Sequence, residues 1–121
     1  MAHKLLIVMV NTDPSNPSEL SAPFFQATVA AAMEYDVEVI LAGRSGELAI
    51  KGVAEKIPAR AGEPKTIYDV MKDAHDAGVK FKVCTTVEQW GDEVIPEIEE
   101  VVGGAYLVSD AMDDDTVTFT Y

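Results

Sequence analysis

One cysteine, Cys84, ends an apolar and β-branched run within Gly78–Gly91 and is followed directly by Thr85 and Thr86. Such a thiol can act as a nucleophile once it ionises, because the thiolate is the reactive form. Cysteine is also a small apolar filler of buried strands, and the residue alone favours that commoner role. Because the chain has no second cysteine, it forms no internal disulfide, and thiol chemistry here would have to use one sulfur.

The residues after the cysteine predict a local effect on its ionisation. Thr86 and Gln89 have the spacing of a capping box, which predicts a short helical turn that begins just after Cys84. The free N–H groups of such a turn favour the thiolate, whereas Glu88, Asp92, Glu93 and the negative net charge favour the thiol. A helix-dipole contribution of ~0.3–1 kcal/mol is less than one pKa unit, so the sequence leaves this balance open.

Polar residues that follow the expected strands are candidates for shaping a pocket around the thiol. These candidates are Asn11, Asp13, Arg44, Gly46, Thr85, Thr86 and Trp90. Neither the loop after the first strand nor the loop after Cys84 contains a lysine, arginine or histidine, so Arg44 is the nearest candidate cation. Asn11 and Asp13 also suit the simpler role of turn formers, and Trp90 suits core packing as well as a pocket wall.

We expect no metal and no cofactor. His3 and His75 have no spaced partner ligand, and Asp113–Asp115 lacks the alternating ligand spacing of a calcium loop. Neither GxGxxG nor GxxxxGK[ST] occurs in the chain, so dinucleotide and P-loop nucleotide binding lose their usual phosphate cradle.

Length and charge narrow the class of protein further. With 121 residues, 48% of them hydrophobic, the chain suits a single domain over residues 1–121. Its 21 acidic and 9 basic residues give a net charge of −12, which repels phosphate backbones and anionic lipids, so nucleic acid is not an expected partner. The first apolar run has only seven residues, too few to span a bilayer, so we expect no membrane insertion and a cytoplasmic protein.

Strand and helix patterns alternate along the chain, which positions these candidates. The expected strands are Lys4–Val10, Asp36–Gly43, Val79–Cys84, Ile98–Val102 and Thr116–Tyr121. We expect four helices. The first runs from Ser18 or Ser21 to Tyr35, and the second begins at Ser45 and carries the apolar stripe Ile50, Val53, Ala54 and Ile57. The third runs from a capping box at Thr66 and Asp69 to Gly78, and the fourth from Ala105 to about Met112.

This alternation predicts an α/β fold, namely a single Rossmann-like three-layer domain with a five-stranded, mainly parallel sheet. We predict the strand order 2-1-3-4-5, which makes the first and third strands neighbours. Ligands of such sheets bind beyond the carboxyl ends of the strands where the order reverses. In that order, residues 11–13 and 84–86 would line one crevice together.

The order of segments resembles a known family. The run GVKFKVCTTVEQWGDEVIPEIEEVVGGAYLVSDAMDDDTVTF, residues 78–119, is similar to the second half of the DsrE/F-like (DsrE/DsrF/DsrH) sulfur-relay proteins. In that family a strand that begins with Gly-Val ends in cysteine. It is followed by an acidic stretch with Ile-Pro, a strand, a Gly pair, a helix and a short strand. The segment GRSGELAIKGVAEKI, residues 43–57, resembles the middle of that family.

The resemblance implies a DsrE/F-like domain in which Cys84 receives sulfur as a persulfide and passes it to another thiol. The implied partners are thiol- or persulfide-bearing donor and acceptor proteins, and sulfurtransferase activity is left open. Some family members lack the cysteine and serve as assembly partners, so a non-catalytic small-ligand-binding or assembly subunit is the alternative.

We also expect a homo-oligomer. Val117, Phe119 and Tyr121 alternate toward one face of the short final strand, and an unprotected strand edge is usually paired or covered. Phe24 and Phe25 are adjacent, so a helix turns only one of them fully inward. The resembled family forms closed oligomers, and here a trimer is slightly favoured over a dimer or a hexamer.

Overall fold

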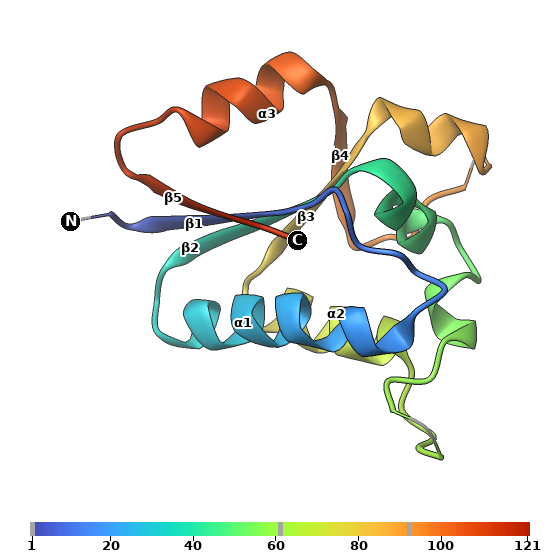
Figure 1. Ribbon diagram of the computed structural model, residues 1–121. Coiled ribbons are helices and arrows are strands. Elements are labelled where there is room, and N and C mark those ends of the chain that lie inside the picture. The colour runs from blue at the N-terminus through green and yellow to red at the C-terminus, as the bar shows by residue number, and fades with distance from the viewer. Residues whose placement is uncertain (1, 61, 92) are drawn as a thin grey trace.

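The computed structural model describes residues 2–60, 62–91 and 93–121. Within them, five parallel strands form one sheet (Figure 1). The strands are β1 (Lys4–Met9), β2 (Asp36–Leu41), β3 (Lys80–Cys84), β4 (Ile98–Val102) and β5 (Thr116–Thr120). The expected α/β class with a parallel five-stranded sheet is confirmed. Residues Met1, Ala61 and Asp92 lie outside the described ranges.

The predicted strand order 2-1-3-4-5 is wrong, because the sheet has the order β4-β3-β2-β1-β5. β2 pairs with both β1 and β3 and is the central strand. Burial explains this position, since all residues of β2 after Asp36 are buried, whereas β4 and β5 at the two edges are mostly exposed. Periodicity predicts which residues form a strand but not which strands become neighbours.

Three α-helices of the described chain cover the two faces of the sheet (Figure 1). α1 (Ser21–Ala32) and α2 (Ile67–Asp76) lie on one face, and α3 (Gly104–Ala111) lies on the other. α1 begins at the expected Ser21 but ends before Tyr35, because Glu34 takes the left-handed conformation, with φ 70°, that terminates helices. None of the helices in the described ranges is long and apolar enough to cross a membrane.

The capping box expected at the start of α2 is confirmed. The Asp69 carboxylate accepts a hydrogen bond from the Thr66 backbone N–H at 3.0 Å, and Thr66 Oγ1 accepts one from the Asp69 N–H at 3.2 Å. Two N–H groups at the helix terminus are thereby satisfied. The pKa of Asp69 is accordingly lowered, chiefly by the bond from the Thr66 backbone.

The α-helix expected after Ser45 is not formed. Two short 3-10 helices, η2 (Gly43–Ala49) and η3 (Ala54–Lys56), occupy this segment. Gly52, with φ 92°, interrupts the helical path, and Ile50 forms an isolated bridge with Val94 instead. The apolar residues expected to line this helix, Ile50, Val53, Ala54 and Ile57, therefore pack in loops and short turns instead. A local sequence pattern cannot exclude such a competing long-range contact.

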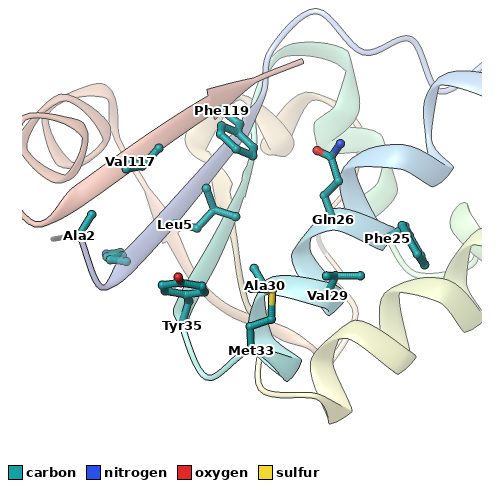
Figure 2. A pocket seen from close by; sticks show the side chains of 11 residues that line it. Ala2, Leu5, Phe25, Gln26, Val29, Ala30, Met33, Tyr35, Val117 and Phe119 are labelled. Carbon is teal, nitrogen blue, oxygen red and sulfur yellow. The ribbon is translucent and has the colours of Figure 1, made fainter.

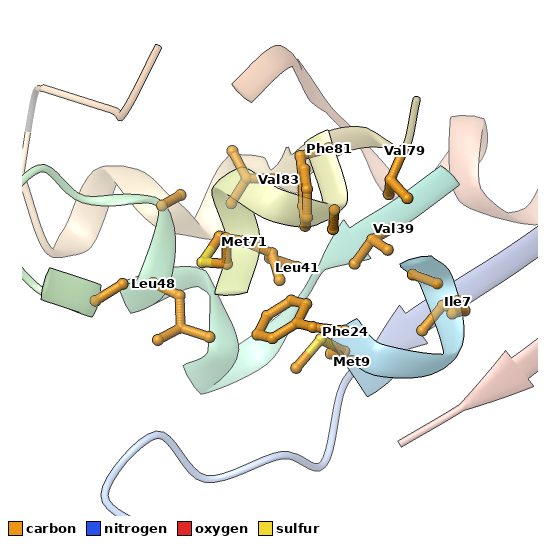
Figure 3. Packing of buried hydrophobic residues seen from close by; sticks show 14 of the residues in the cluster. Ile7, Met9, Phe24, Val39, Leu41, Leu48, Met71, Val79, Phe81 and Val83 are labelled. Carbon is orange, nitrogen blue, oxygen red and sulfur yellow. The ribbon is translucent and has the colours of Figure 1, made fainter. Parts of the chain in front are cut away.

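The main core lies between the sheet and the α1–α2 layer. Phe24 of α1 packs on Phe81 of β3 with their ring centroids 5.9 Å apart, and Met9, Leu41 and Met71 surround them (Figure 3). A smaller cluster lies on the α3 face and consists of Leu6, Val8, Ile40, Ala42 and Val102. The carboxyl ends of β1, β2 and β3 are thus held in place by the main core on one face of the sheet and by the smaller cluster on the other.

Candidate functional site

Cys84 is the last residue of β3 and is half-buried. It is opposite Val102 of β4 in the sheet register, and its side chain packs against the small cluster on the α3 face. Tyr106 and Leu107 of α3 pack against the same cluster. The expected placement of Cys84 at the carboxyl end of a strand is therefore what the structure shows, with an apolar surface behind the sulfur.

The predicted helical turn does follow the cysteine, as the 3-10 helix η4 (Thr85–Gln89). Cys84 itself is the N-cap residue, and no side chain caps this turn, so the capping box predicted from Thr86 and Gln89 is not formed. Thr85 and Thr86 are exposed beside the thiol.

Burial raises the pKa of the Cys84 thiol, since desolvation disfavours the charged thiolate. Desolvation is the one cause of this direction. A raised pKa lowers the thiolate fraction at neutral pH.

Gly46 and Trp90 come together between η2 and η4, as candidate pocket residues should. A Cβ added to Gly46 would lie 3.0 Å from Cζ3 of the Trp90 ring and 3.7 Å from a methyl group of Val83. The absence of a side chain at Gly46 is thus what lets the indole pack closely on this loop. Trp90 joins the turn after Cys84 to the loop after β2.

Asp13 and Arg44 also come together, through an ion pair of 3.2 Å between the loops after β1 and β2. Asp13 Oδ1 accepts hydrogen bonds from the backbone N–H and the hydroxyl of Ser15, and these bonds lower the pKa of Asp13. Arg44 is further paired with Glu47 at 3.6 Å. Arg44 is therefore engaged by two carboxylates.

The expectation that residues 11–13 and 84–86 line one crevice is wrong, because β2 separates β1 from β3. Neighbouring strands are ~4.8 Å apart, so the ends of β1 and β3 are separated by roughly 10 Å. Asn11 is exposed, and its backbone N–H donates to the Tyr121 carbonyl at the end of β5. The surroundings of Cys84 are thus built from β2, β4, η4 and α3 rather than from the loop after β1.

Ser45 is a buried residue whose role the sequence did not show. Its hydroxyl lies within hydrogen-bonding distance of the carbonyl oxygens of Met9 and Ala42, so it ties the end of β1 to the end of β2. The sequence predicted Ser45 to cap a helix. The structure shows instead that its hydroxyl faces the carbonyl oxygens at the ends of two strands.

A buried ionic network lies on the α3 face of the sheet, and sequence reasoning missed it. Lys82 Nζ is 3.0 Å from Glu38 Oε2, and the Tyr106 hydroxyl hydrogen-bonds both of these groups. Lys4 Nζ pairs with Asp110 at 2.6 Å and lies 3.6 Å from Glu38. The available signal in the sequence was a charged residue in the middle of each strand, Glu38 in DVEVIL and Lys82 in KFKVC, with apolar residues on both sides.

Glu38 and Asp110 titrate as a pair within this network. Burial, followed by a hydrogen bond with Asp110, raises the pKa of Glu38. Burial opposes the Asp110 charge too, but hydrogen bonds with Glu38 and Lys4 outweigh it and lower the pKa of Asp110. Oδ2 of Asp110 is buried and has no hydrogen-bond partner among the described residues.

This network is next to the thiol in the fold. Lys82 and Cys84 are two residues apart on β3 and so project from the same face of the sheet. Tyr106 belongs to the network and also packs on the small cluster that contacts Cys84. The network thus fixes α3 over the sheet beside the candidate site. No group of three or more His, Cys, Asp or Glu side chains within the described ranges is arranged to hold a metal ion.

Comparison with known proteins supports the fold. No family model matches the chain, and no curated protein matches it. Among solved structures, the chain is similar to the crystal structure of the YchN protein from E. coli, with a TM-score of 0.75 over 100% of both chains. The two sequences are 16% identical, so this likeness shows a shared Rossmann-like α/β fold and leaves the activity to be argued from the site.

Proposed function

We propose that this protein is a DsrE/F-like sulfur carrier, or sulfurtransferase, that holds a persulfide on Cys84. The observation that carries the proposal is the position of the chain's only cysteine at the carboxyl end of β3, half-buried beside exposed Thr85 and Thr86. Reactive groups of parallel α/β sheets lie at that edge. The segment order that resembles the DsrE/F-like proteins supports the same function, and the fold shared with YchN is compatible with it.

The chemistry needs one thiolate and no cofactor. The Cys84 thiolate attacks the outer sulfur of a donor persulfide, the donor S–S bond breaks, and the donor leaves as a thiolate. An acceptor thiolate then attacks the outer sulfur of the Cys84 persulfide and releases the Cys84 thiolate. Each step exchanges one S–S bond for another, so no external oxidant or reductant is consumed. The thiol proton passes to the leaving thiolate or to water.

A raised pKa is compatible with this role. It lowers the fraction of Cys84 that is ionised at neutral pH, but a thiolate of higher pKa is the stronger nucleophile. Apolar side chains of the α3 face pack against the Cys84 side chain. The expected partners are persulfide-bearing donor proteins and thiol acceptors, and the need for a reduced lone thiol fits a cytoplasmic location.

Sulfur transfer to the purified protein tests the proposal. Incubation with a low-molecular-weight persulfide should add the mass of one sulfur atom to the intact protein, and a reductant should remove it. Cys84→Ser should abolish the addition, whereas Thr86→Ser, an exposed neighbour that keeps its hydroxyl, should retain it. Intact-protein mass spectrometry reads both results. No addition to the wild type under conditions that load a known carrier would reject the carrier function.

The alternative is a non-catalytic small-ligand-binding or assembly subunit of the same fold. It is favoured by the packing of Cys84 against the small apolar cluster and by the burial that raises its pKa. In that case Cys84→Ser would leave binding of a partner unchanged, and the thiol would resist modification in the folded protein but react after denaturation. The rate of thiol labelling with and without denaturant separates the two functions.

A further inference from the structure

The negative charge of this chain is concentrated in the segment that begins at the thiol. Residues 84–121 contain ten of the 21 acidic residues and none of the nine lysines and arginines or the two histidines. Residues 1–83 hold the other eleven acidic residues and all nine basic ones, so their charges nearly cancel. A one-sided field of this kind attracts partners of the opposite charge and repels those of the same charge.

Exposed members of this acidic segment lie around the candidate site. η4 lies beyond the carboxyl end of β3, and α3 covers the sheet face beside it (Figure 1). Glu88 of η4 is exposed four residues after Cys84, and Asp114 is exposed just after α3. The surface beside the thiol therefore has acidic residues at both ends of α3.

The two lysines that reach this face are held beneath the surface. Lys82 Nζ is 3.0 Å from Glu38, and the Lys82 side chain is only 8% exposed. Lys4 Nζ is 2.6 Å from Asp110, and the Lys4 side chain is 21% exposed. Both lysines neutralise buried carboxylates, so neither offsets the acidic residues that face solvent.

The outer face of α3 is an exposed apolar surface between these acidic residues. Gly104, Val108 and Met112 are spaced four residues apart and so lie along one side of the helix. All three are exposed, and the exposed fractions of Val108 and Met112 are 60% and 76%. Asp110, the one charged residue of the helix, is directed inward to Lys4. Solvent-facing sides of helices usually carry charge, so this apolar side is suited to being covered.

The outer face of α3 is separate from an apolar groove on the other face of the sheet. That groove has a volume of ≈ 480 Å³ and lies between α1 and β5. Figure 2 shows Val117 and Phe119 on β5 facing the side chains of α1. Cys84 packs on the α3 face instead. A protein that covers α3 therefore lies beside the thiol, whereas an occupant of the groove does not.

α3 also leads directly to the thiol. Val102 is opposite Cys84 in the sheet register, and α3 begins two residues later, at Gly104. The helix has eight residues and is thus about 12 Å long. An extended segment of about four residues spans this distance, so one short stretch of a partner can lie along α3 and reach Cys84.

We propose that the outer face of α3, with the acidic residues at its ends, is the docking surface for the protein that accepts sulfur from Cys84, and that this acceptor carries lysine or arginine around its reactive cysteine. The inference rests on the proposed sulfur-carrier function. In the transfer step, the acceptor thiolate bonds to the outer sulfur of the Cys84 persulfide, and the S–S bond breaks with its electron pair on Cys84.

The chemistry of this step favours a basic acceptor. The acceptor attacks as an anion, which the acidic surface repels unless cations accompany it. The same cations lower the pKa of the acceptor thiol and so favour its ionised form. An apolar centre with a charged rim is the usual anatomy of a protein interface. A second copy of this chain is a poor occupant, because it would bring acidic residues against acidic ones.

A synthetic peptide serves as the probe for docking. It has nine residues, with a central cysteine, a leucine on each side of it and lysines at both ends, and spans roughly 30 Å when extended. The cysteine is blocked with iodoacetamide, and the protein is free of persulfide, so that fluorescence anisotropy measures docking alone. The lysine peptide should bind at least tenfold more tightly than its glutamine counterpart. Raising the salt concentration from ~0.01 M to ~0.1 M should weaken its binding severalfold.

Charge-reversal variants locate the surface. Glu88→Lys and Asp114→Lys should each raise the dissociation constant of the lysine peptide at least fivefold. Glu55→Lys and Asp76→Lys change the net charge equally but lie on η3 and α2, which pack on the main core, and should change it less than twofold. Val108→Gln, which leaves the charge unchanged, should raise it at least threefold. All five positions are exposed, and circular dichroism verifies that each variant folds.

Equal effects of Asp114→Lys and Asp76→Lys would overturn the proposal, because the general field of an acidic chain would then account for binding. An unchanged dissociation constant in Val108→Gln, or no preference for the lysine peptide, would overturn it as well. The unblocked lysine peptide should also take sulfur from loaded Cys84, and docking without transfer would reject its role as acceptor. Failure to load Cys84 rejects the carrier function, whereas failure of the blocked peptide to dock rejects only this surface.

Discussion

At the residue scale, the environment of Cys84 is set by burial more than by charge. The thiol packs against an apolar cluster, and desolvation alone accounts for the direction of its pKa. Arg44, the candidate cation, is held by Asp13 and Glu47. A carrier built this way relies on the intrinsic nucleophilicity of its thiolate rather than on a permanently ionised sulfur.

The pH dependence of thiol alkylation follows from this burial. Because the neutral thiol is favoured in the folded state, the rate of reaction of Cys84 with iodoacetamide should rise with a midpoint above the ~8.5 of an unperturbed cysteine. The denatured protein, whose cysteine is solvated, should titrate near that ordinary value. A folded-state midpoint below it would show that the N–H groups of η4 dominate the thiol.

The Lys82–Glu38 pair offers a second test at this scale. Lys82→Met should destabilise the protein by about 3–5 kcal/mol, because it leaves Glu38 buried without its closest cation, and Glu38→Gln in the same chain should restore much of that loss. Urea unfolding of the single and double variants measures both changes.

Lys80 is the matched control on the same strand. Its pair with Asp36 is 3.7 Å long, and both side chains are about half exposed, so Lys80→Met should change the free energy of unfolding by less than ~1 kcal/mol. Equal effects of Lys80→Met and Lys82→Met would contradict the assigned role of burial.

At the element scale, two sequence segments with the same capping pattern have different outcomes. Thr66 and Asp69 form a capping box at the start of α2, whereas Thr86 and Gln89 form none in η4. α2 continues for ten residues and buries Ile67, Met71 and Ala74, while η4 has five residues and buries Val87. The cap is formed where a full helix packs on the core behind it.

A pair of threonine variants measures this difference. Thr66→Ala should lower the free energy of unfolding by about 1 kcal/mol, because it leaves the Asp69 N–H without its side-chain acceptor. Thr86→Ala should cause a change of less than ~0.5 kcal/mol, since the Thr86 side chain caps nothing. Chemical denaturation compares the two, and a larger loss for Thr86→Ala would be inconsistent with the geometry of η4.

At the scale of the whole molecule, the two faces of the sheet have different roles. The α3 face carries the buried ionic network and Cys84. The α1–α2 face carries the main core and an apolar groove between α1 and β5, lined in part by Phe25, Met33 and Phe119. A charge of −12 on 13.1 kDa opposes association everywhere except at such a neutral surface. The expected homo-oligomer and its preference for a trimer stay predictions.

Ionic strength should therefore strengthen self-association. Raising the salt concentration from ~0.01 M to ~0.1 M shortens the Debye length from about 30 Å to about 10 Å, which screens the repulsion between acidic copies. Residues 20–33 and 116–121, which supply most of the lining of this groove, contain no charged residue and so no ion pairs for salt to weaken, and the dissociation constant should fall severalfold. Sedimentation equilibrium measures this change. Dissociation on adding salt would point to an interface held by ion pairs, in conflict with the groove.

Local patterns determined the elements of this protein. Apolar runs and capping residues are short-range signals, and they predicted the five strands, the three α-helices and the position of Cys84 at a strand end. Only the tertiary structure decided the strand order, the replacement of a helix by η2 and η3, and the separation of Asn11 from Cys84. It also decided that Glu38, Lys82 and Asp110, far apart in sequence, share one buried network. These features depend on which distant surfaces pack together, and a periodicity of two or of 3.6 residues carries no information about that choice.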